Sequence, residues 1–119
     1  MKNTVFYLPS CDSCRKIIKA ISPKASLAYH DIKQDPLTEL QLQELQALAG
    51  SYEALFSRKA QLYKAYNLKN QTLTEADYKK YLLEHYTFLA RPVFVIENQV
   101  YICNKPEIVA KALAALAHD

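Results

Sequence analysis

The stretch that decides the fold is Phe6-Tyr7-Leu8-Pro9-Ser10-Cys11-Asp12-Ser13-Cys14-Arg15-Lys16. The apolar run from Thr4 to Leu8 predicts a buried strand, and Pro9 and Ser10 end it just before a segment with helical periodicity. Two cysteines therefore lie where a strand gives way to a helix. With Ser10 or Cys11 as the N-cap, Cys11 lies beside unpaired backbone N–H groups and at the positive end of the helix dipole, which favour a thiolate.

Cys11 is the thiol for which we expect a lowered pKa and the nucleophilic role. Cys14 follows one helical turn later, so it can reach back toward Cys11 and close a disulfide. Arg15 and Lys16 add positive charge nearby, which favours the thiolate. A Cys-x-x-Cys pair between a strand and a helix is typical of thioredoxin-like redox chemistry.

The cysteine pair could instead have one of two structural roles. It could be half of a zinc site, but such a site wants four ligands. Beyond the pair, the chain offers only Cys103, His30, His85 and His118. Neither a second Cys-x-x-Cys nor a His-x3-His spacing accompanies them, which speaks against zinc. The second role is that of two inert cysteines within the folded chain.

Length and composition predict one folded domain over residues 1–119, with enough apolar residues for a core of its own. The net charge of +3 is too small to argue for direct binding of nucleic acid, although an anionic small molecule remains compatible. Three cysteines, two of them close together, argue against a secreted disulfide framework. Because no signal peptide and no long apolar span is evident, we expect a soluble, cytoplasmic protein without membrane contact, and a monomer.

The first 32 residues predict a strand, a helix and a second strand. Residues 14–21 form an amphipathic helical pattern that Ser22-Pro23 ends, and residues 26–32 resemble a strand. The crossover between two such strands is right-handed, which makes them parallel neighbours. Cys11 then lies at the carboxyl edge of the sheet, where open α/β sheets place ligands.

The middle of the chain predicts an all-helical insertion at about residues 38–88. Thr38 opens a helix and Gly50, the only glycine in the chain, ends it as a left-handed cap. The apolar face expected for this helix is Leu40, Leu42, Leu45 and Leu48. Further helical segments are expected around residues 52–56, 62–66 and 74–85.

The last part of the chain predicts a hairpin and a final helix. The strands are residues 93–96 and 100–103, joined by a turn at Glu97-Asn98-Gln99. The final helix starts near Pro106, with Ile108, Val109, Leu113 and Leu116 on its inner face. Cys103 is then expected to be a buried strand cysteine rather than a resolving thiol. The order βαβ, helices, ββα predicts an α/β, thioredoxin-like fold with a four-stranded mixed sheet.

Over nearly its whole length the chain resembles the arsenate reductase/Spx family of thioredoxin-fold proteins. Three blocks carry the resemblance: Pro9-Ser10-Cys11-Asp12-Ser13-Cys14-Arg15-Lys16, Leu55-Phe56-Ser57-Arg58-Lys59 and Leu89-Ala90-Arg91-Pro92-Val93. The resemblance implies that Cys11 is the catalytic thiol, that Arg58 and Arg91 bind an oxyanion beside it, and that Pro92 is a cis proline facing it. Without the resemblance, Arg58 reads as a solvated surface residue.

The chain departs from the arsenate reductases at two positions. Where they carry a further arginine after the hairpin, only Lys105 could supply charge here, and a lysine is a point charge without the arginine fork. Where they carry a histidine four residues before the nucleophile, this chain has Tyr7. Both departures weaken the case for arsenate as the physiological substrate.

The resemblance leaves more than one function open. The first is a thiol-dependent reductase of an oxyanion or a disulfide, with Cys14 or glutathione resolving the intermediate and with electrons from glutathione and glutaredoxin or from thioredoxin. No bound cofactor is expected, since the chain has no glycine-rich loop. The second is an Spx-like redox-sensing regulator that binds the C-terminal domain of the RNA polymerase α subunit. The third is a member that keeps the fold and has lost activity.

Overall fold

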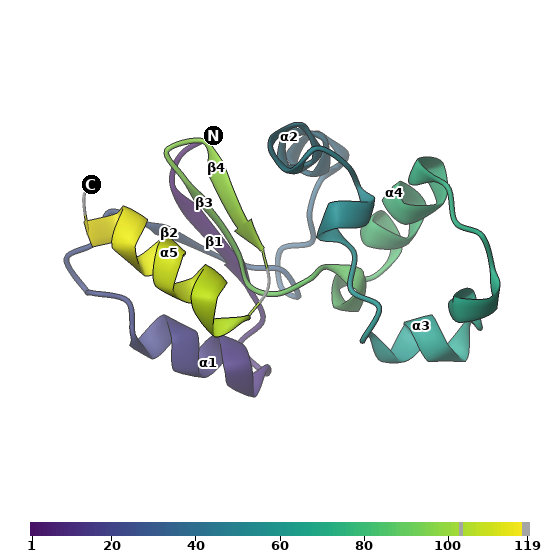
Figure 1. Ribbon diagram of the computed structural model, residues 1–119, viewed down its shortest axis with the longest axis horizontal. Helices are drawn as coiled ribbons and strands as arrows, with labels where there is room; N and C mark the ends of the chain where they lie inside the picture. Colours follow the sequence, from purple (N-terminus) through teal and green to yellow (C-terminus); the bar gives the residue numbers. More distant parts are fainter. Residues whose placement is uncertain (103, 118–119) are drawn as a thin grey trace. The chain divides into compact units, whose positions relative to one another are not determined.

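The computed structural model describes residues 1–102 and 104–117 (Figure 1). In chain order its elements are β1 (Thr4–Tyr7), α1 (Asp12–Lys19), β2 (Ala28–Asp31), α2 (Glu39–Ala49), η1 (Glu53–Leu55), α3 (Gln61–Ala65), η2 (Leu68–Asn70), α4 (Glu75–Glu84), η3 (Tyr86–Phe88), β3 (Val93–Ile96), β4 (Gln99–Ile102) and α5 (Pro106–Ala117), where η marks a 3₁₀ turn. The chain divides into two compact units, Met1–Asp35 with Arg91–Asp119, and Pro36–Ala90. The first contains the sheet and the second the helices between its halves.

The sheet unit contains a four-stranded mixed sheet in the order β2-β1-β3-β4. β1 pairs with β2 in parallel, as the right-handed crossover predicts, and Val5 lies opposite Tyr29. β3 runs antiparallel to both β1 and β4, with Val5 opposite Phe94 and Phe94 opposite Tyr101. The predicted fold class, with its four-stranded mixed sheet, is therefore confirmed.

α1 and α5 pack against one face of this sheet (Figure 1). The core of this layer is Val5, Ile21, Phe94, Ile96, Ala112 and Leu116. Because side chains alternate along a strand, Val5, Phe94 and Ile96 all project to this face. α1 adds Ile17 and Ile18, which are partly buried against the same core. This packing fixes the N-terminus of α1 just beyond the end of β1.

The β3–β4 turn is shorter than the sequence suggests. Glu97 and Asn98 have φ values of 50° and 61°, the left-handed region that a two-residue type I′ turn requires. Gln99 is therefore the first residue of β4, opposite Ile96, and not a turn residue. The Asn3 side-chain oxygen accepts the Glu97 N–H at 2.9 Å, which anchors the turn. The expectation for Cys103 lies outside the described residues.

In the helical unit, α2 begins and ends where the sequence predicts. Thr38 and Gln41 form a reciprocal capping box, and Gly50 ends the helix with φ 96°. Leu42 and Leu45 are fully buried, but Leu40 is 65% exposed. Residue 40 lies two positions before residue 42, about 200° around the helix. The prediction that Leu40 belongs to the apolar face was therefore wrong.

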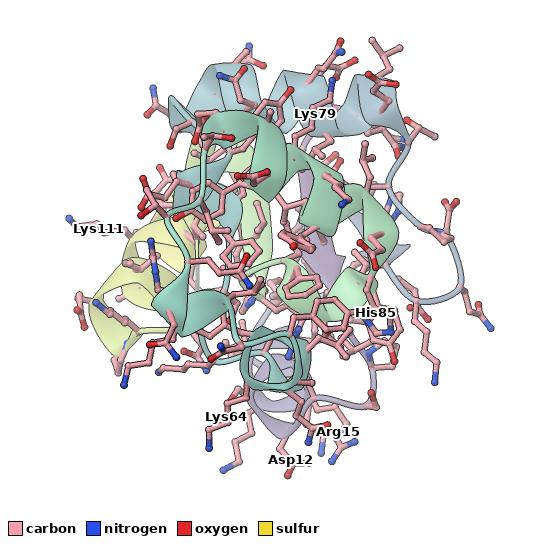
Figure 2. All side chains as sticks on the ribbon, turned by 90° about the vertical axis from the view of Figure 1, so that its right-hand side faces the viewer. Asp12, Arg15, Lys64, Lys79, His85 and Lys111 are labelled. Carbon is pink, nitrogen blue, oxygen red and sulfur yellow. The ribbon has the colours of Figure 1, made fainter. Side chains whose placement is uncertain are left out.

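α4 joins α2 through a charged contact. Thr74 caps α4 with the same reciprocal arrangement that Thr38 makes for α2, here with Asp77. Tyr78 and Leu82 are buried, as their helical spacing predicts. The half-buried Lys79 donates to Glu39 at 2.8 Å, and Figure 2 shows Lys79 next to α2.

Phe88 lies at the centre of an aromatic cluster in the helical unit. Its ring stacks on Phe56 with centroids 5.2 Å apart, and the rings of Tyr81 and Tyr66 lie within 5.4 and 6.0 Å. A backbone hydrogen bond links the same two segments, since the Ser57 N–H donates to the Phe88 carbonyl at 2.7 Å. Phe56 and Leu89 form an isolated antiparallel bridge. The insertion is therefore not wholly helical, because the segments around these residues pair as short extended pieces.

Among the described residues, none of the helices combines the length and apolar character needed to cross a bilayer.

Candidate functional site

The cysteine pair lies at the N-terminus of α1, directly after β1. Cys11 is the N-cap, with φ −89° and ψ 120°, and its N–H donates to the Leu8 carbonyl at 3.0 Å. Its carbonyl accepts the Arg15 N–H at 3.0 Å, the first hydrogen bond of the helix. Because β1 ends at Tyr7, this turn carries Cys11 to the carboxyl edge of the sheet. The predicted strand-to-helix junction is confirmed.

The two cysteines differ in their access to solvent. Both are free thiols, but Cys11 is partly exposed whereas Cys14 is 0% exposed. Cys14 is the third residue of α1, so it lies one turn inside the helix on the side facing the core. A reagent or substrate arriving from solvent can therefore meet Cys11 first.

The pKa of the Cys11 thiol lies below its ordinary value because the groups that stabilise a thiolate outweigh burial. Partial burial raises this pKa, and the hydrogen bonds offered by the backbone N–H and the thiol of Cys14 lower it. The charge and the hydrogen bond of the Arg91 guanidinium lower it further. Backbone N–H groups at a helix N-terminus and a nearby cation are the features that activate cysteines in general.

The pKa of the Cys14 thiol is shifted in the opposite direction, to about 11. Burial is the largest cause, and the negative charge of Cys11 and the hydrogen bond between the two thiols raise the pKa further. The Leu8 backbone and the Arg91 charge act against this rise without cancelling it. Cys14 therefore stays protonated and supplies a donor to the Cys11 thiolate.

The sheet register brings Arg91 to the cysteine pair. Phe6 near the end of β1 lies opposite Val93 at the start of β3, and the two strands are antiparallel. Continuing past this pair, the residues before Val93 run alongside the residues after Phe6, toward the start of α1. The Arg91-Pro92 peptide bond is cis, as the resemblance implied, and Pro92 is buried. Arg91 and the cysteine pair thus share one edge of the sheet.

Arg15 has a different partner from the one its position suggests. Its guanidinium forms an ion pair with Asp12 and donates to the Pro9 carbonyl at 3.2 Å. Figure 2 shows Arg15 and Asp12 side by side at the exposed end of α1. The cation that lowers the pKa of the Cys11 thiol is Arg91, just before β3, and not Arg15 or Lys16. Adjacency in sequence therefore pointed to the wrong positive charge.

Arg58 lies in the helical unit, in the loop that follows η1. Its Nη2 donates to Glu53 Oε2 at 2.6 Å and to the Tyr78 hydroxyl at 3.1 Å. Its guanidinium carbon is 5.9 Å from the centroid of the Tyr78 ring, and about half of the side chain is exposed. The hydrogen bond to Glu53 is the main reason that the pKa of Arg58 is raised. Neither Glu53 nor Tyr78 was identified from the sequence as its partner. An association of Arg58 with Cys11 stays a prediction.

Lys105 precedes α5 and is exposed. Its carbonyl accepts the N–H groups of Ile108 and Val109, both at 3.0 Å, so its backbone starts the helix. A role of its ammonium group in substrate binding stays a prediction. Within residues 1–102 and 104–117, the structure gathers no set of three or more His, Cys, Asp or Glu side chains suited to a metal ion.

Comparison with known proteins gives matches that span nearly the whole chain. The sequence model of the ArsC family matches residues 6–112. An arsenate reductase from Haemophilus influenzae is 27% identical over 124 residues, which cover 95% of this chain and 100% of that protein. The global transcriptional regulator Spx from Streptococcus pneumoniae is 27% identical over 111 residues, which cover 90% of this chain and 83% of the regulator.

Solved structures agree with this chain in fold. The arsenate reductase from Vibrio cholerae superimposes with a TM-score of 0.78 at 22% identity, over 95% of this chain and 98% of that one. At this identity the match is evidence for the fold alone, and it confirms the thioredoxin-like arrangement predicted from the order of the elements.

Proposed function

Because the chain belongs to the ArsC family, we propose that it is a thiol-dependent reductase in which Cys11 is the nucleophile and Cys14 the resolving thiol. The observation that carries the proposal is the opposite shift of two neighbouring pKa values, lowered for Cys11 and raised to about 11 for Cys14. Attack requires a thiolate that solvent can reach, whereas resolution requires a second thiol held in reserve nearby. Cys11 meets the first requirement and Cys14 the second.

With a disulfide substrate the reaction has two steps. Cys11 Sγ attacks one substrate sulfur, so the new S–S bond forms as the substrate S–S bond breaks, and the departing thiolate takes a proton from solvent. Cys14 then loses its proton to solvent and attacks Cys11 Sγ, releasing the second substrate thiolate. Two electrons have passed to the substrate, and the Cys11–Cys14 pair is left as a disulfide.

With an arsenate-like oxyanion the same nucleophile acts on the central atom. Cys11 Sγ displaces a hydroxyl group, which leaves as water after protonation, and a sulfur–arsenic bond forms. A thiol, either Cys14 or glutathione, then attacks Cys11 Sγ. The sulfur–arsenic bond breaks with its electron pair on arsenic, which is thereby reduced from As(V) to As(III), and a disulfide remains. Disulfide and oxyanion substrates therefore make the same demand on Cys11.

Cationic side chains are proposed to hold the anionic part of the substrate. Arg91 is the best supported, because its guanidinium already acts on the Cys11 thiolate. An arginine fork can bind a carboxylate or a tetrahedral oxyanion by paired hydrogen bonds. Arg58 is assigned the same role by the resemblance, and Pro92 is assigned to the substrate wall. Lys105 is proposed only as the charge available where the arsenate reductases carry a further arginine. The lysine would contribute only a point charge.

The electrons that restore the dithiol are proposed to come from glutathione with glutaredoxin, or from thioredoxin. Either donor carries out thiol–disulfide exchange with the oxidised pair and needs no group bound permanently to the chain. A monomer working in the cytoplasm, where such donors keep thiols reduced, fits this chemistry.

Turnover of a mixed disulfide of glutathione, and of arsenate, tests the proposal. We expect Cys11→Ser to abolish turnover of both, and Cys14→Ser to leave partial activity that depends on added glutathione, since glutathione can then resolve the intermediate. A Cys11→Ser protein that reduces these substrates as fast as the unmodified chain would remove the proposal.

A second candidate is a redox-sensing regulator like Spx. The match to the pneumococcal regulator is as strong in identity as the match to the Haemophilus reductase, and Lys105 and Tyr7 depart from the reductase pattern. In this role the Cys11–Cys14 disulfide would change a surface that meets the C-terminal domain of the RNA polymerase α subunit, with no turnover. Pull-down with that domain in reduced and oxidised states tests it, and absence of binding in both states would exclude it.

A further inference from the structure

The helical unit contains a pocket whose charged lining residues are all cationic. Its volume is about 240 Å³, and it is lined by Arg58, Tyr63, Lys64, Asn67, Lys69 and Asn70. Three of these six residues carry a positive charge and the other three are neutral and polar at their tips. We propose that this pocket, which we call the basic pocket, binds a small polyvalent anion with phosphate or carboxylate groups. The proposal gives Arg58 a role separate from the one that the resemblance assigns to it beside Cys11, and it does not depend on thiol chemistry.

The lining residues offer the two kinds of contact that such an anion needs. Arg58 presents a planar fork that binds two oxygens of one phosphate or carboxylate group. Lys64 and Lys69 are exposed point charges that can neutralise further oxygens. A concave surface lined by one sign of charge concentrates counter-ions of the opposite sign. The volume is below the range of about 300–1,000 Å³ that is typical of drug-sized ligands, which favours a small molecule.

The wall between α3 and η2 is held in place by hydrogen bonds within the chain. Asn67 has a left-handed φ of 55°, which turns the chain back at the end of α3. The Gln71 side-chain amide donates to the Tyr66 carbonyl at 3.1 Å, and the Asn70 amide donates to Asn67 Oδ1 at 2.6 Å. Leu68 in this turn is 1% exposed, so its buried side chain stabilises the turn. A pocket that is already formed avoids the entropic cost of ordering its walls on binding.

Arg58 is already bound to an anion of the chain itself. Glu53 Oε2 lies 2.6 Å from Arg58 Nη2, so the guanidinium makes the contact that a ligand carboxylate would make. Glu53 is fixed in turn, because its backbone N–H and that of Tyr52 donate to the Glu75 carboxylate at 3.0 and 2.7 Å. A bound anion would share Arg58 with Glu53 and be repelled by it. Removing the Glu53 charge should therefore tighten binding.

The test is calorimetric titration of the full chain at low salt with inorganic pyrophosphate and, separately, with citrate. We expect Lys64→Ala/Lys69→Ala to weaken binding by about tenfold, because two charge-assisted contacts are lost. The matched control is Lys19→Ala/Lys111→Ala, which removes the same charge from exposed positions on α1 and α5; Figure 2 shows Lys111 projecting from α5. Glu53→Gln should tighten binding by about threefold.

The outcomes separate the possible sources of the anion. Binding of pyrophosphate alone identifies a phosphate site, binding of citrate alone a carboxylate site, and binding of both a general polyanion site, provided that the control double variant keeps its affinity. Amide chemical shifts should change at Asn67 and Asn70. Equal loss of affinity in both double variants, shift changes confined to other residues, or no binding of either probe would overturn the proposal.

Discussion

Selective alkylation of the two cysteines is the clearest quantitative consequence of their different environments. The perturbation is iodoacetamide at neutral pH, which reacts with thiolates and not with thiols. With a pKa of about 11, Cys14 is a thiolate in only about one molecule in ten thousand at pH 7. A thiol with the ordinary pKa of 9.0 is ionised in about 1% of molecules at that pH, so ionisation alone slows Cys14 by about a hundredfold.

Burial slows Cys14 further, because the residue is 0% exposed and the reagent must reach its sulfur. The assay is mass spectrometry of the peptide that contains each cysteine, sampled over time, with the urea-unfolded chain as the reference for each thiol. Cys11 should be modified faster in the folded than in the unfolded chain, and Cys14 at least about a hundredfold more slowly. In Cys11→Ser the pKa of Cys14 should fall, because the neighbouring negative charge is gone, but burial should keep the reaction slow.

The result that would refute this reasoning is a folded chain in which Cys14 reacts within about tenfold of its unfolded rate. Such a rate would mean that the thiol is neither buried nor held protonated. A Cys11 that is alkylated no faster in the folded than in the unfolded chain would separately refute the stabilisation of its thiolate by Cys14 and Arg91.

Three further predictions concern the electrostatics of the site and the stability of the fold. Arg91→Gln should shift the pH dependence of Cys11 alkylation to higher pH, because a cation that lowers the pKa of this thiol is removed. The control Arg15→Gln should leave the pH dependence unchanged, because the Arg15 guanidinium is paired with Asp12. Gly50→Ala should lower the free energy of unfolding by about 1 kcal/mol in urea, because residue 50 has a left-handed φ of 96°. The added Cβ would meet no neighbouring group within 4 Å, so the cost is conformational and not steric, and an unchanged midpoint would contradict it. Leu42→Ala should lower the free energy of unfolding by about 2–5 kcal/mol and the matched Leu40→Ala by less than about 0.5 kcal/mol, because only Leu42 is buried. Equal losses in urea unfolding would contradict the assignment of Leu42 to the core and Leu40 to the surface.

Local sequence signals predicted the structure correctly where it depends on residues that are close together in the sequence. Pro9 and Ser10 mark the junction that makes Cys11 an N-cap, and Thr38 and Gly50 bound α2 because a hydroxyl cap and a residue without a side chain suit those two backbone positions. The boundaries of β3 were also predicted, since a run of β-branched and aromatic residues flanked by turn signals indicates a strand.

The rest of the site depends on contacts between residues far apart in the chain. Arg91 reaches the cysteine pair because Phe6 and Val93 pair in the sheet, and a register of this kind cannot be read from local periodicity. Resemblance to a family identified Arg91, whereas charge next to the motif pointed to Arg15. The contact of Arg58, in the loop after η1, with Tyr78 in α4 had no local signal in the sequence.

The central claim is that the fold makes Cys11 a better thiolate than the same residue in an unfolded chain. Its pKa can be measured from the pH dependence of alkylation of the Cys11 peptide, in the native chain and in urea. The account predicts that the native pKa lies below the unfolded one, because the Cys14 N–H and thiol and the Arg91 guanidinium outweigh burial. A native value equal to or above the unfolded value would contradict it.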